Sequence, residues 1–341
     1  MNTLLNNILS IDVEDWFHIL DSPSAPDIDQ WSKLPLRVEH GMEQILLILG
    51  DTGTKATFFW LGWMAERFPK LLRMCHEAGH EIANHGYGHV LAYKVGHNKF
   101  KLDVIRGKEI LEDLIGEPVR GFRAPGFGIT DKTPWAFDVI KEAGNDYDSS
   151  IFPASRGHGG INNSPIGPYF IMTQNGMLPE IPMSVVEMFG RRFSMFGGGY
   201  LRLATRRMIR WGIDRLLKDQ QPLIVYVHPR EIDPDHPRLP LSPIRRFRSY
   251  VNLKSTFPKL QWLCENYSFC TMHKMVEDFV KSFYYDAREG IPVVKLQGSA
   301  PSDRTPFRFI PLSARSIESY RTLKKKQETH TVDLHTASEN M

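Results

Sequence analysis

The chain has 341 residues, of which 42% are hydrophobic and 24% are charged, and this composition excludes disordered, collagen-like and coiled-coil proteins. Its formal net charge of +3 is too small to indicate nucleic-acid binding, so we expect no nucleic-acid partner. Its three cysteines form no CxxC pair, which argues against a disulfide scaffold. The sequence shows neither a signal-peptide pattern nor an apolar run of membrane-spanning length, and we therefore expect a cytoplasmic protein.

Short β-like runs alternate with helical stretches over most of the chain. In chain order we predict a strand at 7–13, a helix at 37–49, a strand at 55–61, a helix at 63–78, a strand at 81–84, a helix at 100–115, a strand at 119–123, a helix at 133–143, strands at 147–152 and 180–187, a helix at 203–217, a strand at 222–227, a helix at 253–265 and a last strand at 269–272. This alternation favours an α/β fold with a mostly parallel sheet or barrel.

The alternation fades beyond about residue 283, and the sequence after Gly298 is rich in Ser, Thr, Pro and Lys. Such a composition rarely forms a packed core. We therefore expect one barrel domain over residues 1–275 and a C-terminal extension over 276–341, of which the last ~40 residues are mobile.

Five of the predicted strands end in polar residues that can do chemistry. In chain order these are Asp12, Glu14 and Asp15 after the first strand, then His85 with His89, then Arg123, then Asp148, then His228. The carboxyl ends of parallel strands lie at one edge of a sheet or barrel, where α/β proteins place their sites. We therefore expect these side chains to converge on a single site.

The H-x-x-x-H spacing of His85 and His89 suits two ligands of a divalent metal, and the acidic cluster could supply a third. Two histidines and a carboxylate leave coordination positions open for water, which suits hydrolysis. Glycines at 86 and 88 favour a tight loop over an ordinary helix. The alternatives are two unrelated loop histidines and an acidic cluster that forms a solvated turn or caps the next helix.

Arg123 lies in a buried strand, so it requires a carboxylate from another strand, either within a site or in a structural ion pair. His228 follows five apolar residues and is a site residue or a rim residue.

Residues 191–215 hold seven arginines, and 245–248 add three. We interpret these arginines as the solvated face of a helix whose apolar positions include Met208, Trp211 and Leu216. The alternative is contact with anionic lipid or a phosphate-bearing substrate. The glycines at 197–199 are interpreted as a flexible loop.

The ordered motifs SIDVED, NHGYGH, RAPG, YDSS and VYVHP, spread over roughly Leu9–Thr271, resemble those of the polysaccharide deacetylases of carbohydrate esterase family four, the NodB-homology group. The phrases SIDVEDWFH, YDSSIFP and HPREIDPD look closest to the subgroup associated with exosortase and exopolysaccharide gene clusters. The resemblance implies an α/β fold of the distorted (β/α)7 barrel type, with the catalytic barrel over 1–275.

The resemblance also implies a divalent metal, most often zinc in the family, held by Glu14, His85 and His89. The family's first motif commonly has adjacent aspartates, whereas Val13 separates the acids here. Asp15 therefore stays open as an alternative ligand to Glu14.

The remaining roles implied by the resemblance concern acid–base chemistry. Asp12 would be the general base, with its carboxylate fixed by Arg123. The amide of Gly126 would help to stabilise the oxyanion. His228 would protonate the leaving amine and would be oriented by Asp148.

These roles imply a metal-dependent hydrolase that removes N-acetyl groups from N-acetylhexosamine units of a polysaccharide or its lipid-linked precursor in exopolysaccharide biosynthesis. The expected partners are that glycan and, through the arginine-rich segments, an anionic membrane surface. Two alternatives stay open: a cyclic amide or ureide hydrolase on the same fold, and a non-catalytic glycan-binding relative.

Overall fold

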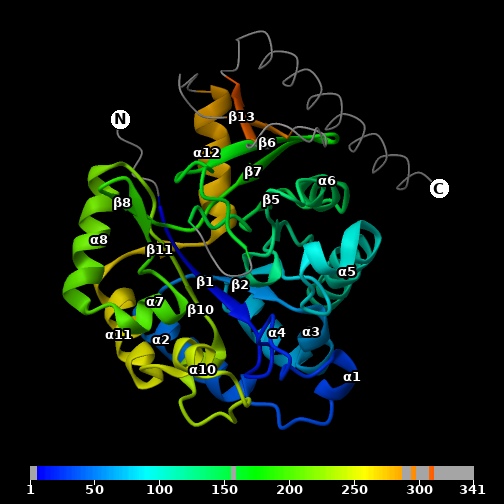
Figure 1. Ribbon diagram of the computed structural model, residues 1–341, viewed down its shortest axis with the longest axis vertical. Helices are drawn as coiled ribbons and strands as arrows, with labels where there is room; N and C mark the ends of the chain where they lie inside the picture. Colours follow the sequence, from blue (N-terminus) through cyan, green and yellow to red (C-terminus); the bar gives the residue numbers. More distant parts are fainter. Residues whose placement is uncertain (1–5, 155–158, 286–292, 297–306, 311–341) are drawn as a thin grey trace.

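The computed structural model describes residues 6–154, 159–285, 293–296 and 307–310. Helices pack around a large curled sheet (Figure 1). The strands are β1 (Asn7–Val13), β2 (Thr57–Trp60), β3 (Glu81–Asn84), β4 (Gly121–Phe122), β5 (Tyr147–Asp148), β6 (Tyr169–Thr173), β7 (Gly176–Glu180), β8 (Val186–Met188), β9 (Arg191–Phe193), β10 (Ile224–Val227), β11 (Phe269–Cys270), β12 (Val293–Leu296) and β13 (Phe307–Ile310).

The α-helices are α1 (Ile28–Trp31), α2 (Val38–Thr52), α3 (Gly62–Arg67), α4 (Pro69–Glu77), α5 (Ala92–Ile115), α6 (Trp135–Glu142), α7 (Gly198–Leu203), α8 (Arg206–Lys218), α9 (Pro229–Ile232), α10 (Pro243–Tyr250), α11 (Thr256–Asn266) and α12 (Met272–Tyr285). Two short 3-10 helices, η1 (Pro125–Phe127) and η2 (Leu253–Ser255), complete the described elements. Among the helices that the structure describes, none combines the length and the apolar character needed to cross a membrane.

Parallel pairings join β10, β1, β2, β3, β4, β5 and β7 in that order. Beyond β7 the sheet continues through antiparallel β6, then β12 and β13, while β11 adds a short pairing to β1. The parallel run confirms the predicted barrel-type fold, and it brings the carboxyl ends of its strands to one edge, as a site at strand ends requires.

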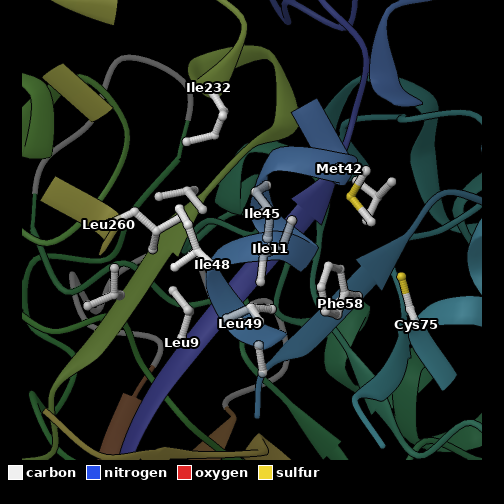
Figure 2. Packing of buried hydrophobic residues seen from close by; sticks show 14 of the residues in the cluster. Leu9, Ile11, Met42, Ile45, Ile48, Leu49, Phe58, Cys75, Ile232 and Leu260 are labelled. Atoms are coloured by element: carbon white, nitrogen blue, oxygen red, sulfur yellow. The ribbon is translucent and has the colours of Figure 1, made fainter. Parts of the chain in front are cut away.

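The alternation of side chains along β1 separates the core from the site. Leu9, Ile11 and Val13 pack in the outer layer, whereas Ser10 and Asp12 reach the polar network inside the sheet. Figure 2 shows α2 lying over the outer face of β1, with Met42, Ile45, Ile48 and Leu49 packed around Leu9, Ile11 and Phe58. Burying each aliphatic side chain of this kind stabilises the fold by about 1.5–3 kcal/mol, so the layer holds β1 rigidly beneath the site.

Two predicted helices differ from the structure at a proline and a glycine. The single helix expected over 63–78 is two helices, because Pro69 begins α4 and the chain leaves helical geometry at Phe68. The helix expected from residue 100 begins eight residues earlier at Ala92, and Gly96 interrupts it with a φ of 75°.

The predicted helices and strands are less accurate in the second half of the chain. The expected helix over 203–217 is the pair α7 and α8, and Gly198 and Gly199 begin α7 instead of forming a flexible loop. The expected strand at 180–187 is the end of β7 and the start of β8, and β6 was not predicted. The predicted domain boundary at residue 275 falls inside α12. Apart from β13, the tail predicted to be mobile lies outside the described residues.

Candidate active site

Three strands deliver the acidic and imidazole side chains to one point at the edge of the sheet. β1 carries Asp12 and leads into Glu14, β3 leads into His85, and β10 leads into His228. The Glu14 carboxylate is the centre of the group: its Oε1 lies 2.9 Å from His89 Nε2, 3.3 Å from His85 Nε2 and 3.6 Å from His228 Nε2. All of these side chains are buried.

The loop from His85 to His89 is held by acceptors on neighbouring elements. Gly86 donates its backbone N–H to Asn84 Oδ1 at 2.8 Å, and the Asp103 carboxylate on α5 accepts from the N–H groups of Tyr87 and Gly88. A Cβ at residue 86 would lie 2.3 Å from Asp103 Oδ2, and the φ of 77° there favours glycine. The predicted tight loop is confirmed, and its glycine is required by the close approach of Asp103.

The hydrogen bonds of His85 suit a cation site. Its Nδ1–H donates to the carbonyl of Arg123 at 2.7 Å, and this bond directs Nε2 toward the Glu14 carboxylate. Nε2 and Glu14 Oε1, which lie 3.3 Å apart, are both atoms that can bind a metal cation. Glu14, His85 and His89 each offer one ligand atom, all within 4.8 Å of one another, and this donor set fits Zn²⁺.

The electrostatics of Glu14 agree with such a site. Burial alone would raise the pKa of Glu14, but the neighbouring His89 and His228 and the hydrogen bonds from His85 and His89 hold it well below its usual range. Burial lowers the pKa of His89 despite the Glu14 charge, which keeps this imidazole neutral and able to act as a ligand.

Asp15 faces away from the histidines and caps the outer helix α2. Its Oδ2 accepts the backbone N–H of Arg37 at 2.7 Å and that of Val38 at 3.1 Å, and its Oδ1 accepts from Trp16 at 2.7 Å. A carboxylate at the start of a helix stabilises the exposed N–H groups there. The structure therefore brings Glu14, and not the alternative Asp15, to the histidines.

Asp12 is fixed by Arg123, whose side chain is fully buried. Arg123 Nη1 donates to Asp12 Oδ1 at 2.7 Å and to Ser10 Oγ at 2.8 Å, while its other nitrogens donate to Ser149 O and Oγ. The guanidinium carbon lies 4.1 Å from the ring centroid of Phe59. The second Asp12 oxygen, Oδ2, stays directed toward the site, at 3.9 Å from His228 Nε2.

His228 is oriented by Glu231 and not by Asp148. Its Nδ1 lies 3.0 Å from Glu231 Oε2, and its backbone N–H donates to the same oxygen at 3.1 Å. Burial would lower the pKa of His228, but the charges of Glu14 and Glu231 outweigh it and raise the pKa above its ordinary value. The prediction that Asp148 orients His228 is wrong, because the Glu231 carboxylate, three residues after His228, contacts its Nδ1 instead.

Asp148 belongs to a second buried acidic pair. Its Oδ1 accepts from Ser150 Oγ at 2.6 Å, and Ser150 Oγ in turn accepts the N–H of Ala124, which leads into the turn with Gly126. Burial raises the pKa of Asp148 to about 6, and burial together with the Asp148 charge raises the pKa of Glu180 well above its usual value. Through Ser150, Asp148 of this pair therefore helps to hold the turn that contains Gly126.

A cavity of about 800 Å³ opens onto the site. Asp12, Glu14, His89, Gly126 and His228 line its catalytic end. Its outer wall is formed by α7, α10 and the residues after β10, including Tyr200, Leu203, Arg230, Phe247 and Arg248. Gly126 adopts a φ of 61° in η1, which brings its backbone to the cavity wall.

Sequence reasoning missed Asp103, Glu231 and Arg202. Glu231 lies three residues after His228 and behind Pro229, a spacing that is typical of a helix start in which the third residue reaches back. That signal could have found Glu231. Asp103 and Arg202 contact the site groups only through the packing of α5 and α7, so no local pattern marks them.

Two family models and several curated relatives match parts of the chain. Residues 30–147 match the family model for polysaccharide deacetylases, and residues 149–277 match the model for a domain of unknown function, DUF3473. A peptidoglycan-N-acetylglucosamine deacetylase from Bacillus cereus is 37% identical over 101 residues, which are 30% of this chain and 46% of that protein. A chitooligosaccharide deacetylase from Azorhizobium caulinodans is 33% identical over 79 residues, which are 23% of this chain and 38% of that protein. The chain spans less than half the length of both relatives.

The fold extends the likeness over most of the chain. A crystal structure from Mycobacterium smegmatis, classed with the polysaccharide deacetylases, aligns with a TM-score of 0.57 at 18% identity and covers 89% of this chain and 97% of its own. At this identity the likeness shows the fold alone. Residues 30–147 therefore match the polysaccharide deacetylase model, within a fold that resembles this solved structure over most of the chain.

Proposed function

We propose that the protein is a metal-dependent N-deacetylase that hydrolyses the acetamide of N-acetylhexosamine units in a polysaccharide or its lipid-linked precursor. One observation carries the proposal: Asp12, Glu14, His85, His89 and His228 come from three strand ends and meet in one buried cluster, and all of them except His85 line one end of a cavity. A base, an acid and a metal-ligand set within one buried cluster are the groups that amide hydrolysis needs.

The metal would be held by Glu14, His85 and His89, which fit zinc as described above. When bound, such an ion supplies a Lewis acid that lowers the pKa of water and polarises a carbonyl oxygen. Glu14 is kept ionised by its histidine neighbours, and His85 is kept in the ligating tautomer by the carbonyl of Arg123.

The proton transfers fall to Asp12 and His228. Asp12 Oδ2 faces the site while Arg123 holds Oδ1, so Asp12 is oriented to remove the proton of the attacking water. His228 Nε2 faces the same space, and its raised pKa favours the imidazolium that would transfer a proton to the departing amine nitrogen. Gly126 lines the cavity, and its amide would donate a hydrogen bond to the developing oxyanion.

The size of the cavity supports a sugar substrate. Its volume of about 800 Å³ lies at the upper end of the range for small-molecule sites and exceeds what a single small cyclic amide would fill. The exposed Tyr200 on α7 and Phe247 on α10 line the wall, where aromatic side chains could contact sugar rings.

Acetate release from purified, zinc-loaded protein tests the reaction class. We expect release from N-acetylglucosamine oligomers, no ring opening of a cyclic ureide, and loss of activity in Asp12→Asn. Asp51→Asn, an exposed aspartate on α2, is the matched control and should keep full activity. Ring opening without acetate release would instead support the cyclic amide hydrolase. Zinc retention with neither reaction would support a non-catalytic glycan-binding relative.

We further propose that the substrate is carried on lipid and that the outer cavity wall rests on an anionic membrane, as expected of exopolysaccharide biosynthesis. Helix α10 exposes Ile244 and Phe247 at 69% and 57%, flanked by the exposed Arg246 and Arg248. Exposed apolar side chains beside arginines are typical of a helix that binds at an anionic lipid surface. Because Phe247 and Arg248 also line the cavity, this contact would place the cavity mouth at the membrane.

Co-sedimentation with vesicles tests the membrane contact. We expect the protein to bind phosphatidylglycerol vesicles and not phosphatidylcholine vesicles. The double variant Ile244→Ser, Phe247→Ser should lose this binding, while Leu102→Ser, which removes an equally exposed side chain from α5, should retain it. Equal binding to both vesicle types, or by both variants, would contradict the proposal.

A further inference from the structure

The segment that matches the domain of unknown function contributes directly to the site. Its strand β10 pairs in parallel with β1, with Ile11 opposite Val227, so the residue after each strand reaches the same edge of the sheet. The segment thereby supplies His228, while Asp12 and Glu14 precede both matched regions and the two ligand histidines lie in the deacetylase match. The proton donor and the two ligand histidines thus come from different matched parts of the chain.

Glu231 contacts His228 through one of its two oxygens. Glu231 Oε2 accepts both the ring Nδ1–H and the backbone N–H of His228, at 3.0 and 3.1 Å. These two bonds fix the ring against its own backbone. With Nδ1 bound in this way, Nε2 points into the site, toward Glu14 and Asp12.

The other oxygen of Glu231 is bound by Arg202 on α7. Arg202 Nη1 donates to Glu231 Oε1, and both side chains are buried. The remaining nitrogens of Arg202 donate to backbone carbonyls at the end of α10, namely those of Arg248, Ser249 and Val251. The guanidinium of Arg202 therefore ties Glu231 on α9 to α7 and to the end of α10.

We infer that Glu231, clamped by Arg202, is the positioning residue that holds His228 as the proton donor, and that the segment of unknown function serves to supply this His228–Glu231–Arg202 unit. The inference rests on the proposed deacetylase function and deepens it. The buried Arg202 also keeps Glu231 ionised, because it outweighs the effect of burial and, with His228, lowers the pKa of Glu231 to about 2.

The step that Glu231 supports is the cleavage of the C–N bond of the tetrahedral adduct. As this bond breaks, its electron pair stays on nitrogen, and the proton moves from His228 Nε2 to that nitrogen. The Glu231 carboxylate remains ionised and stabilises the imidazolium beforehand through Nδ1. A leaving group that departs without a proton does not need this support.

The difference between leaving groups gives the test. Kinetics are measured for the zinc-loaded full chain on an N-acetylglucosamine oligomer and on 4-nitrophenyl acetate, whose phenolate leaves without a proton. Glu231→Gln should lower kcat on the amide by about 100-fold with little change in KM, and leave the rate on the ester unchanged. The matched control Glu265→Gln, an exposed glutamate of the same segment, should match the wild type on both substrates.

A double-variant cycle gives an independent readout. If Glu231 acts through His228, then adding Glu231→Gln to His228→Gln should cause no further loss of amide hydrolysis. The paired variant Arg202→Met, Glu231→Gln removes both buried charges together, so it avoids leaving an unpaired Arg202, and it should show the same difference between amide and ester.

The inference is overturned if Glu231→Gln hydrolyses the amide as fast as the wild type. It is also overturned if amide and ester rates fall together, which is the result of a purely structural role, or if the losses from Glu231→Gln and His228→Gln multiply. Failure of the proposed function is a different result, because the wild type itself would then release no acetate.

Discussion

Replacing Gly86 with alanine tests how the loop presents the two histidines. The residue has a φ of 77°, and an added Cβ would lie 2.3 Å from Asp103 Oδ2. The left-handed conformation costs an alanine about 1–2 kcal/mol. The Asp103 carboxylate must also move away, which weakens the hydrogen bonds donated by Tyr87 at 3.0 Å and Gly88 at 2.7 Å, each worth about 1.5–3 kcal/mol to a charged acceptor.

Losing one of these bonds together with the backbone strain costs about 3 kcal/mol in total. Because the loop must be ordered to hold the metal, we expect zinc affinity to fall by about 100-fold, at 1.4 kcal/mol for each factor of ten. Competition with a chromophoric chelator measures this affinity directly. The rest of the fold should persist, because the loop adds only the partly buried Tyr87 to the packed outer layer around β1 and α2.

Gly50→Ala is the matched control. Gly50 lies inside α2, and no atom would come within 4 Å of an added Cβ. We expect this variant to gain about 0.5–1 kcal/mol of stability and to bind zinc as the wild type does. Wild-type zinc affinity in Gly86→Ala would refute the reasoning, because it would mean that the loop geometry does not control the ligands.

Four further substitutions separate the roles of the buried acids and of Arg123. The folded chain retains protons on Asp148, whose pKa is about 6, and on Glu180, whereas the unfolded chain releases them near pH 4. The stability that this pair contributes is therefore greatest below about pH 4 and falls as pH rises through 6. In thermal unfolding scans, the melting temperature of Glu180→Gln should rise relative to that of the wild type as pH increases. A difference in melting temperature that does not change with pH would contradict this. Asp15→Asn should lower the melting temperature and preserve zinc affinity, whereas Glu14→Gln should abolish zinc binding; the reverse pattern would reassign the ligand. Arg123→Met should cost about 3–5 kcal/mol in urea unfolding, since it leaves a buried carboxylate unpaired, and a cost below 1 kcal/mol would contradict the buried pairing.

The sequence predicts the fold best where the periodicity of apolar residues and the polar or helix-breaking residues indicate the same element bounds. β1 and β3 have the predicted bounds, because runs of buried residues there end at chemically distinct polar groups. The helix expected over 63–78 was wrong at Pro69, which the apolar periodicity spans but the backbone does not. Strand β6 was missed because it pairs antiparallel with β7, outside the alternating pattern of strand and helix.

The arginine-rich helix shows why helical spacing alone does not orient a surface. Met208 and Trp211 were predicted to belong to the apolar positions, yet they are 50% and 45% exposed on α8. The face that packs on the core is formed by Ile209, Ile213 and Leu216. Both sets have helical spacing, and only the position of β8 and the neighbouring core decides which of them is buried.

The candidate site was predictable as a set of residues and not as a network. Strand ends brought Asp12, Glu14, His85 and His228 together as expected, because parallel strands share an edge. The partner of His228 depended on which carboxylate is nearer in space. Glu231 contacts His228 because it lies three residues later, in the first turn of α9. The order of the strands does not reveal this contact.

The central claim is that this cluster hydrolyses N-acetyl groups with the help of a bound metal. Acetate release from N-acetylglucosamine oligomers should be measured on the chelator-treated protein before and after zinc is restored, for the wild type and for Glu14→Gln. The account predicts no release before zinc, release after zinc in the wild type, and none in Glu14→Gln under either condition. Equal release by the metal-free protein, or by zinc-restored Glu14→Gln, would contradict it.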